Sequence, residues 1–235
     1  VQRQSFGGWK QSVMGPGAKA GGPNYVAQFG TWADGPLRPF DADISQPVAA
    51  QLRGFERLGL SDEDTAWLWR AAELDQLAWQ QEFGRNHDRA GLVCEANVFR
   101  YRPVLTPLQI RIAADAQLRD VARLALAATR TGSPVRLSAT PDKAAELRGL
   151  GFDVEALSAE AFAHEVAGLE SARVRAVGSV EPGVYEAAVQ SNSVVLDQPV
   201  LADGRRELLA FLLEQAVSVT MHRFGIIRRV SSIRD

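Results

Sequence analysis

Residues 108–139 read LQIRIAADAQLRDVARLALAATRTGSPVRLSA, and this stretch decides the fold. Residues 108–113 form a β-prone run, residues 117–130 carry the spacing of an amphipathic helix, and Gly132 precedes a second β-prone run at 135–139. A strand, a helix and a second strand in this order make a βαβ unit, in which the two strands lie parallel in one sheet. The stretch therefore predicts an α/β domain.

The same alternation continues on both sides and predicts a mostly parallel sheet. Further helices are expected at residues 143–150, 159–169, 184–190 and 205–215. Further strands are expected at residues 95–101, 154–157, 174–177, 194–196 and 217–221. Short β-rich runs separated by amphipathic helices are typical of a Rossmann-like fold, which we assign to residues 93–235.

The segments before this domain differ from it in composition. Residues 1–40 hold eight of the 20 glycines and four of the 11 prolines, so they offer too little apolar area to build a core of their own. Residues 41–92 are expected to form a helical connector made of two helices. In the first helix, Ser45 is the expected cap and Gly59 lies near the expected end.

The second helix of the connector has the stronger signals. Ser61 and Asp64 resemble a capping box, and Gly84 marks the end of the pattern. Three tryptophans on one helix carry more apolar surface than a solvated helix would expose: Trp67, Trp69 and Trp79. We expect the helical pair to pack against a partner surface.

Composition excludes several classes of protein. The 235 residues have a formal net charge of -2, so no basic field is present to collect nucleic acid. A single cysteine, Cys94, allows no internal disulfide and favours a reducing compartment. No run of about 18 apolar residues appears that could cross a membrane. We expect a soluble, cytoplasmic protein that binds no nucleic acid and has no membrane span.

A Rossmann-like domain suggests a nucleotide site, and its first strand-to-helix turn tests this hypothesis. Dinucleotide sites need glycines in that turn, because backbone N–H groups must approach the pyrophosphate. Here the turn reads IRIAADAQLRD, which has no glycine, and Asp115 brings a negative charge to the place of the phosphate. We therefore expect no cofactor to be bound on this chain.

The sequence offers no complete set of catalytic groups. Cys94 has no histidine near it in sequence to act as a base, and a packed or incidental thiol is the simpler interpretation. The three histidines, His87, His164 and His222, are too scattered for metal-ligand spacing. His87 and His164 are expected on the surface. The sequence predicts no metal site and no catalytic residue.

The glycine-rich segment 1–40 contains one motif with a chemical use. In KAGGP, Gly21 and Gly22 follow Lys19, a composition that lets successive backbone N–H groups converge on an anion. The alternative is a tight turn in a surface connection. From the residues alone both interpretations stay open.

Three short segments resemble one family of enzymes. SFGGWKQSVMGPGAKAGGPNYV (residues 5–26) resembles the PFGG-x-x-x-S active-site segment of aldehyde dehydrogenases, with Ser5 in place of the usual proline. Its KAGGPxY end resembles L-glutamate γ-semialdehyde dehydrogenase (1-pyrroline-5-carboxylate dehydrogenase), in particular the bifunctional proline utilization A type. CEANVFRYRP (94–103) resembles that family's GE-x-N-x-x-R stretch, and LLEQAVSVTMHRFG (212–225) resembles its ER-x-V-S-x-N-T motif, with Thr220 near its end.

The resemblance implies a division of labour. The family's cysteine nucleophile, general-base glutamate and NAD fold would lie upstream of this chain, which would be inactive alone. The backbone N–H groups of Gly21 and Gly22, with Ala20 adjacent, would hold the substrate's α-carboxylate. Phe6 would line the aldehyde pocket and Tyr25 would border it. The rest would be a Rossmann-like domain without a cofactor that covers the tunnel between two active sites.

The resemblance also implies cofactors and partners. The whole enzyme would use NAD, and FAD as well where a proline dehydrogenase domain is present. Its partners would be the upstream aldehyde dehydrogenase domain, glutamate semialdehyde as substrate, and further copies of itself in a homo-oligomer. Two other hypotheses remain: a non-catalytic interaction or oligomerisation module, and a free-standing nucleotide-binding protein.

Overall fold

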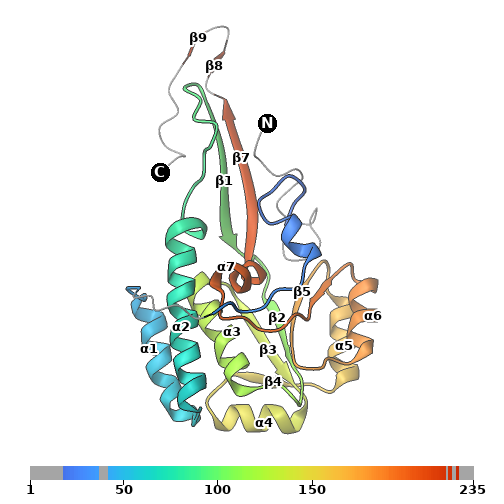
Figure 1. Ribbon diagram of the computed structural model, residues 1–235. Helices are drawn as coiled ribbons and strands as arrows, with labels where there is room; N and C mark the ends of the chain where they lie inside the picture. The colour runs from blue at the N-terminus through green and yellow to red at the C-terminus, as the bar shows by residue number, and fades with distance from the viewer. Residues whose placement is uncertain (1–17, 37–41, 221, 224–225, 228–235) are drawn as a thin grey trace.

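The computed structural model describes residues 18–36, 42–220, 222–223 and 226–227. It consists of a body of helices around a sheet, from which a long two-stranded arm projects (Figure 1). Expectations that concern Phe6, Ser5 and Met221 lie outside the described residues.

Five parallel strands form the sheet of the body, in the order β4-β3-β2-β5-β6. Their bounds are β2 (Leu108–Ile112), β3 (Val135–Ala139), β4 (Val154–Ala156), β5 (Arg173–Val177) and β6 (Val194–Leu196). All residues of the central strand β2 are buried, because helices cover both faces of the sheet. The predicted Rossmann-like parallel sheet is confirmed.

Two pairs of helices cover the sheet. The helices are α3 (Leu118–Thr131), α4 (Pro141–Gly149), α5 (Ala159–Gly168) and α6 (Pro182–Gln190). On one face Leu124 of α3 and Leu147 of α4 share a buried cluster with Ile110 of β2. On the other face Phe162 of α5 and Val184 of α6 pack with β5. From β2 the chain first adds β3 and β4 on one side and then β5 and β6 on the other. The switch of side between β2 and β5 is where α/β sheets most often bind ligands.

The helical connector forms as expected and packs on the body. It comprises α1 (Gln46–Gly54), the 3-10 turn η2 (Phe55–Leu58), α2 (Asp62–Ala78) and the π-helical turn η3 (Trp79–Phe83). Ser61 caps α2 by accepting a hydrogen bond from the Asp64 N–H at 3.1 Å. In a capping box the Asp64 carboxylate would reach back to the Ser61 N–H. Here it binds Arg119 of α3 at 3.0 Å instead, so this part of the expectation is wrong.

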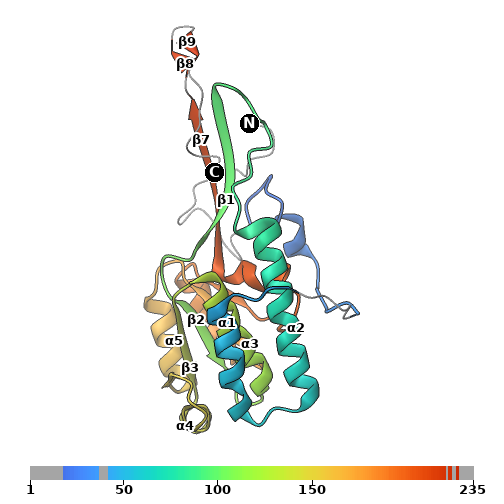
Figure 2. The same cartoon turned by 90° about the vertical axis from the view of Figure 1, so that its left-hand side faces the viewer.

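The tryptophans of the connector find partners within this chain. The guanidinium of Arg119 lies 4.8 Å from the centre of the Trp67 ring, and that of Arg130 lies 4.5 Å from Trp79. Figure 2 shows α1, α2 and α3 side by side, which agrees with their shared apolar cluster. The surface on which the helical pair packs is therefore α3 of the same chain, and Trp69 remains 37% exposed.

The arm consists of β1 (Glu95–Pro103) and β7 (Leu212–Thr220), which run antiparallel with Tyr101 opposite Glu214. The helix expected at 205–215 is wrong in its second half. A short helix α7 (Gly204–Glu207) and a 3-10 turn η4 (Leu208–Phe211) lead directly into β7. Pairing with β1 along the whole arm outweighs the helical preference of residues 212–215.

Three short elements complete the described chain. They are the 3-10 turn η1 (Val26–Phe29) near the N-terminus and the strands β8 (His222–Arg223) and β9 (Ile226–Ile227) beyond the arm. The segment that carries η1 lies beside the base of the arm (Figure 1). This arrangement brings the KAGGP motif next to residues from far along the sequence.

Candidate functional site

The KAGG motif forms a tight turn. The Gly22 N–H donates to the Lys19 carbonyl at 2.8 Å, and Gly21 has a φ of 77°, as the third position of a type II turn requires. The Gly22 amide, which was expected to face a carboxylate, is therefore used inside the turn. Ala20 and Gly21 are exposed at its tip, and no hydrogen bond from their N–H groups occurs within the described part of the chain.

One buried carboxylate holds both ends of this turn. Glu214 of β7 accepts the Lys19 backbone N–H at 3.2 Å on one oxygen and the Asn24 side-chain amide at 2.7 Å on the other. Only 2% of Glu214 is exposed, and this burial raises its pKa, opposed by the hydrogen bonds from Asn24 and Lys19. The Lys19 ammonium is buried as well, and burial lowers its pKa while Glu214 opposes the shift.

Asn24 connects the carboxylate to a second polar group. Its amide nitrogen also contacts the Tyr101 hydroxyl at 2.9 Å, and its oxygen accepts from Arg205 at 2.5 Å. Tyr101 donates to Glu82 at 2.6 Å, and Arg205 pairs with the same Glu82 at 2.5 Å. Burial, followed by the hydrogen bond to Glu82, raises the pKa of Tyr101, so its hydroxyl keeps its proton. The network joins η3, β1, α7 and β7 to the turn.

A cavity of about 390 Å³ lies between the turn and the helical connector. Gly21, Gly22 and Pro23 line it, together with His87 and Arg89 of the connector. His87 is half-buried rather than free on the surface, because its ring contacts the Glu82 carbonyl at 2.8 Å and its backbone pairs with Phe99. Arg89 is exposed and supplies a positive charge to the cavity.

An exposed carboxylate lies at the edge of the sheet where a nucleotide would bind. Asp115 follows β2 and accepts hydrogen bonds from the backbone N–H and the hydroxyl of Ser179, at 2.9 and 2.7 Å. Gly178, which precedes Ser179, has a φ of 82°, and a side chain added at this position would collide with the Asp115 carboxylate. The hydrogen bonds from Ser179 lower the pKa of Asp115 and keep it ionised. An anion here would meet a carboxylate instead of free amides.

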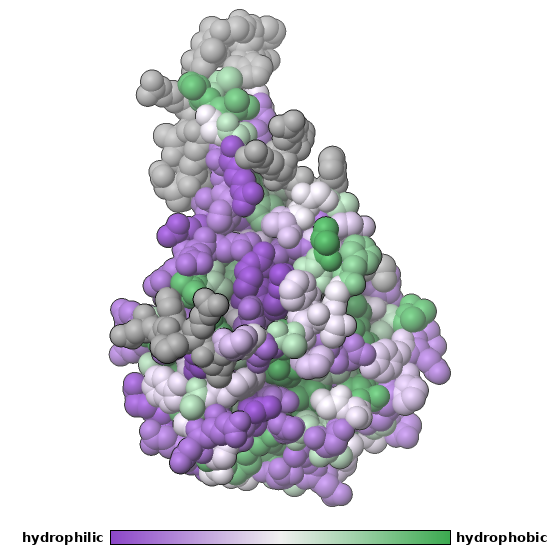
Figure 3. All heavy atoms as spheres, in the orientation of Figure 1, coloured by the Kyte–Doolittle hydropathy of each residue, from purple (hydrophilic) through white to green (hydrophobic). Residues whose placement is uncertain are grey.

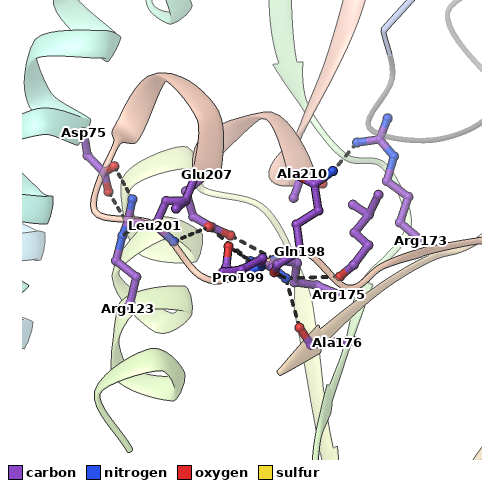
Figure 4. A network of polar contacts seen from close by, with 11 residues as sticks. Asp75, Arg123, Arg173, Arg175, Ala176, Gln198, Pro199, Leu201, Glu207 and Ala210 are labelled. Carbon is purple, nitrogen blue, oxygen red and sulfur yellow. Dashed lines mark hydrogen bonds and ion pairs between the residues drawn. The ribbon is translucent and has the colours of Figure 1, made fainter. Parts of the chain in front are cut away.

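A second polar network joins two helices and the sheet to α7. Arg123 of α3 binds Asp75 of α2 with two hydrogen bonds of 2.9 and 2.7 Å, and Arg175 of β5 binds Glu207 of α7 in the same way at 2.9 and 3.1 Å (Figure 4). The Leu201 backbone links the pairs, since its carbonyl accepts from Arg123 and its N–H donates to Glu207. Each charged group of the two pairs has its partner within the network, and Arg175 and Glu207 also line a neighbouring groove.

An apolar groove of about 520 Å³ lies beside this network, between η1 and the connection from β6 to α7. Trp32 lines it and stacks on the Arg206 guanidinium, 3.6 Å from the ring centre. In η1, Val26 is 79% exposed and Phe29, which also lines the groove, is 73% exposed. Apolar side chains reach the surface where this segment lies (Figure 3).

Two further candidate side chains from the sequence, Cys94 and His164, do not line the cavity beside the turn. Cys94 is a half-buried free thiol, and His164 is exposed on α5. No group of three or more histidine, cysteine, aspartate or glutamate side chains in the described ranges could hold a metal ion. None of the helices found in those ranges is both long and apolar enough to cross a membrane.

The structure places most of the expected site residues in one loop. Ala20, Gly21 and Gly22 form the turn and Tyr25 lies three residues beyond it, 37% exposed, while Phe6 lies outside the described residues. The sequence did not identify the residues that hold the loop. In the sequence Lys19 stands out only as the first residue of the KAGGP motif. Its partner Glu214 lies 195 positions away.

The fold and the loop define a class of protein: a Rossmann-like α/β domain with a carboxylate at its nucleotide edge, joined to a glycine-rich turn. No family model matches the chain, and no curated protein matches it either. Among solved structures it is similar to proline utilization A (PutA) from Corynebacterium freiburgense, with 44% sequence identity and a TM-score of 0.69.

This similarity covers 97% of the present chain but 20% of the Corynebacterium freiburgense chain. The chain thus spans about a fifth of the length of that relative. An identity of 44% over nearly the whole chain, together with the shared fold, shows that this protein is related to PutA.

Proposed function

We propose that this chain is the C-terminal portion of a proline-catabolic enzyme that oxidises L-glutamate γ-semialdehyde to glutamate with NAD. The observation that carries the proposal is the 44% identity with a proline utilization A protein over 97% of the chain. The KAGGPNY motif adds a residue-level reason, because it resembles the aldehyde-binding loop of glutamate semialdehyde dehydrogenases.

In this proposal the turn is the anchor for the substrate's carboxylate. Ala20 and Gly21 carry exposed N–H groups, whereas the Gly22 N–H already donates to Lys19. Backbone amides in such a turn bind an anion by their dipoles without a neutralising side chain. Arg89, which lines the same cavity of about 390 Å³, adds long-range attraction for a carboxylate. Phe6 and Tyr25 would complete the aldehyde pocket.

The Rossmann-like domain acts as a cover without chemistry of its own. The contact of Asp115 with Ser179 supports this role, because it occupies the edge where an α/β sheet would bind a nucleotide. NAD would bind to the upstream aldehyde dehydrogenase domain, which would also provide the cysteine nucleophile and the general base. FAD would be present where a proline dehydrogenase domain accompanies it. The cover would close the tunnel that channels the intermediate.

The anchor is tested by Gly21→Val in the full-length protein. Valine cannot readily adopt the φ of 77°, so the turn must change. Losing a hydrogen bond to a charged group costs about 1.5–3 kcal/mol, so the KM for glutamate semialdehyde should rise by roughly 10- to 100-fold. Turnover of an aldehyde without a carboxylate, such as propionaldehyde, should change little.

The control variant is Gly35→Ala in the same segment, because a Cβ at Gly35 meets nothing within 4 Å. This variant should keep the wild-type KM for both aldehydes. Equal losses for the two aldehydes in Gly21→Val would argue against a carboxylate anchor. Absence of glutamate semialdehyde oxidation by the wild-type full-length protein would remove the proposed function itself.

A second candidate is an interaction or oligomerisation module. Val26 and Phe29 of η1 expose apolar surface. Among the described strands β1 and β7 pair with each other, and on its other side β1 has a bridge to His87 at Phe99, so the arm is not part of a larger sheet. Under this hypothesis the protein forms homo-oligomers through these surfaces. Light scattering of wild type and Phe29→Ser would show a smaller mass for the variant, and an unchanged mass would argue against contacts through η1.

A further inference from the structure

We propose that Glu214, Asn24 and Arg205 are positioning residues for the carboxylate anchor, so that the Rossmann-like domain and its arm set the conformation of the Lys19–Gly22 turn. The inference rests on the proposed function of that turn. It gives the cover domain a second role, because these residues would determine affinity for the substrate's carboxylate without touching the substrate.

The first step concerns the two ends of the turn. Lys19 opens it and Asn24 lies two residues after it, and both donate to the same carboxylate of Glu214, at 3.2 and 2.7 Å. A single side chain thus fixes the separation between the entry and the exit of the loop. Hydrogen bonds to a charged acceptor are among the stronger ones in proteins.

The second step concerns the carboxylate itself. Glu214 lies near the base of β7, opposite Tyr101 of β1, and is almost completely buried. Just before it, Arg173 of β5 donates to the carbonyls of Ala210 and Leu212, at 3.1 and 2.7 Å. These bonds attach the base of the arm to the parallel sheet. Glu214 therefore occupies a fixed position relative to the Rossmann-like domain.

The third step concerns the orientation of Asn24. Arg205 can only donate hydrogen bonds, so the Asn24 atom that it contacts at 2.5 Å is the oxygen. The nitrogen is then the atom that faces Glu214 and Tyr101. Asn24 is only 2% exposed, so breaking these bonds would leave buried polar groups without partners.

The fourth step connects this network with binding. The exposed tip, Ala20 and Gly21, has no side chain larger than a methyl group with which to pack, and Gly21 allows many backbone conformations. The position of its amides therefore depends on how the two ends are held. Releasing the ends should weaken carboxylate binding in the ground state and the transition state alike, which raises KM and leaves kcat almost unchanged.

The test compares Glu214→Gln, Glu214→Leu and Asn24→Leu in the full-length enzyme. Glutamine keeps the shape and one accepting oxygen, so it should retain part of the affinity, whereas the leucines remove the bonds. We expect the KM for glutamate semialdehyde to rise by about 10-fold or more in both leucine variants and by a smaller factor in Glu214→Gln. For all three, kcat should stay within about threefold and propionaldehyde turnover should be unchanged.

The matched control is Gln215→Leu, the next residue on β7, whose side chain accepts from Arg100 and not from the turn. It should leave both KM values unchanged. Folded variants of Glu214 and Asn24 with a wild-type KM would overturn the inference, as would equal losses for both aldehydes, which would indicate a purely structural role. If a leucine variant fails to fold, the isosteric Glu214→Gln decides by the same KM comparison.

The failure of this inference can be separated from the failure of the proposed function. If Gly21→Val raises the KM for glutamate semialdehyde while the Glu214 and Asn24 variants do not, the anchor stands and only the positioning role is lost. If Gly21→Val has no effect either, the turn is not the anchor.

Discussion

At the scale of single residues, Gly178 shows how one backbone position can bring two distant polar residues together at the edge of the sheet. Its φ of 82° turns the chain after β5 so that Ser179 meets Asp115. Any side chain at this position would be strained and would press on the Asp115 carboxylate. The sequence indicated only the missing glycine after β2, and the partner of Asp115 could not be predicted because Ser179 lies 64 positions away.

The consequence can be measured with Gly178→Ala. We expect the free energy of unfolding to fall by about 1–3 kcal/mol, from the strained φ and the loss of the Ser179 bonds. The control is Gly168→Ala, since a Cβ there meets nothing within 4 Å and the φ is not positive. Urea unfolding followed by circular dichroism gives both values, and equal stabilities for the two variants would contradict the explanation.

At the scale of elements, local signals predicted the helices and the central strands well. Caps, prolines and glycines mark the ends of α1, α2 and α3, and these helices begin and end within a few residues of the prediction. The error falls at residues 212–215, where LLEQ has helical preference but belongs to β7. Its pairing with β1 is a contact between distant segments, which no local pattern records.

The caps themselves provide a prediction with a built-in control. Ser61→Ala should lower the free energy of unfolding by about 1 kcal/mol, because the Ser61 hydroxyl accepts the Asp64 N–H. Ser45→Ala should cost less, because the Ser45 side chain makes no capping bond to α1. Thermal unfolding of the two variants checks the order, and a larger loss for Ser45→Ala would show that the bond is not the cause.

At the scale of the whole molecule, the pairs of Asp75 with Arg123 and of Glu207 with Arg175 join α2, α3, β5 and α7. Burial, above all, raises the pKa of Asp75 to about 6 from an ordinary 3.8, against the attraction of Arg123. At pH values between 3.8 and about 6, the Asp75 carboxyl is protonated in the folded protein and ionised in the unfolded chain. The contribution of Asp75 to stability is therefore largest below about pH 4 and falls as the pH rises to about 6.

A comparison with Asp75→Asn isolates this effect. Between pH 4.5 and pH 7.5 the free energy of unfolding of the wild type should fall relative to that of Asp75→Asn by about 2 kcal/mol. Other titrating groups, Glu207 included, act in both proteins and largely cancel in the difference. Asp153→Asn, an exposed position, serves as the control and should follow the wild type. A difference that does not vary with pH would mean that Asp75 keeps its ordinary pKa.

The candidate site shows the same limit of prediction at this scale. KAGGP is a local motif, so the turn at Gly21 could be found in the sequence. Tyr101, Arg205 and Glu214 reach it from β1, α7 and β7, and each of these residues is unremarkable in its own segment. Only the folded sheet brings the bases of both arm strands to the loop.

The arm also has a consequence for how the protein is made. On the ribosome β1 is complete long before β7, because it begins at residue 95 and its partner begins at residue 212. At about 5–20 residues per second, roughly 6 to 23 s pass between the synthesis of the two strands. During that interval β1 lacks the strand that pairs with it along its whole length, and the described bridge from His87 reaches it only at Phe99, so its backbone is more open to other chains than in the folded protein. The nascent chain is therefore most exposed to aggregation, and most dependent on chaperones, in the seconds before β7 leaves the exit tunnel.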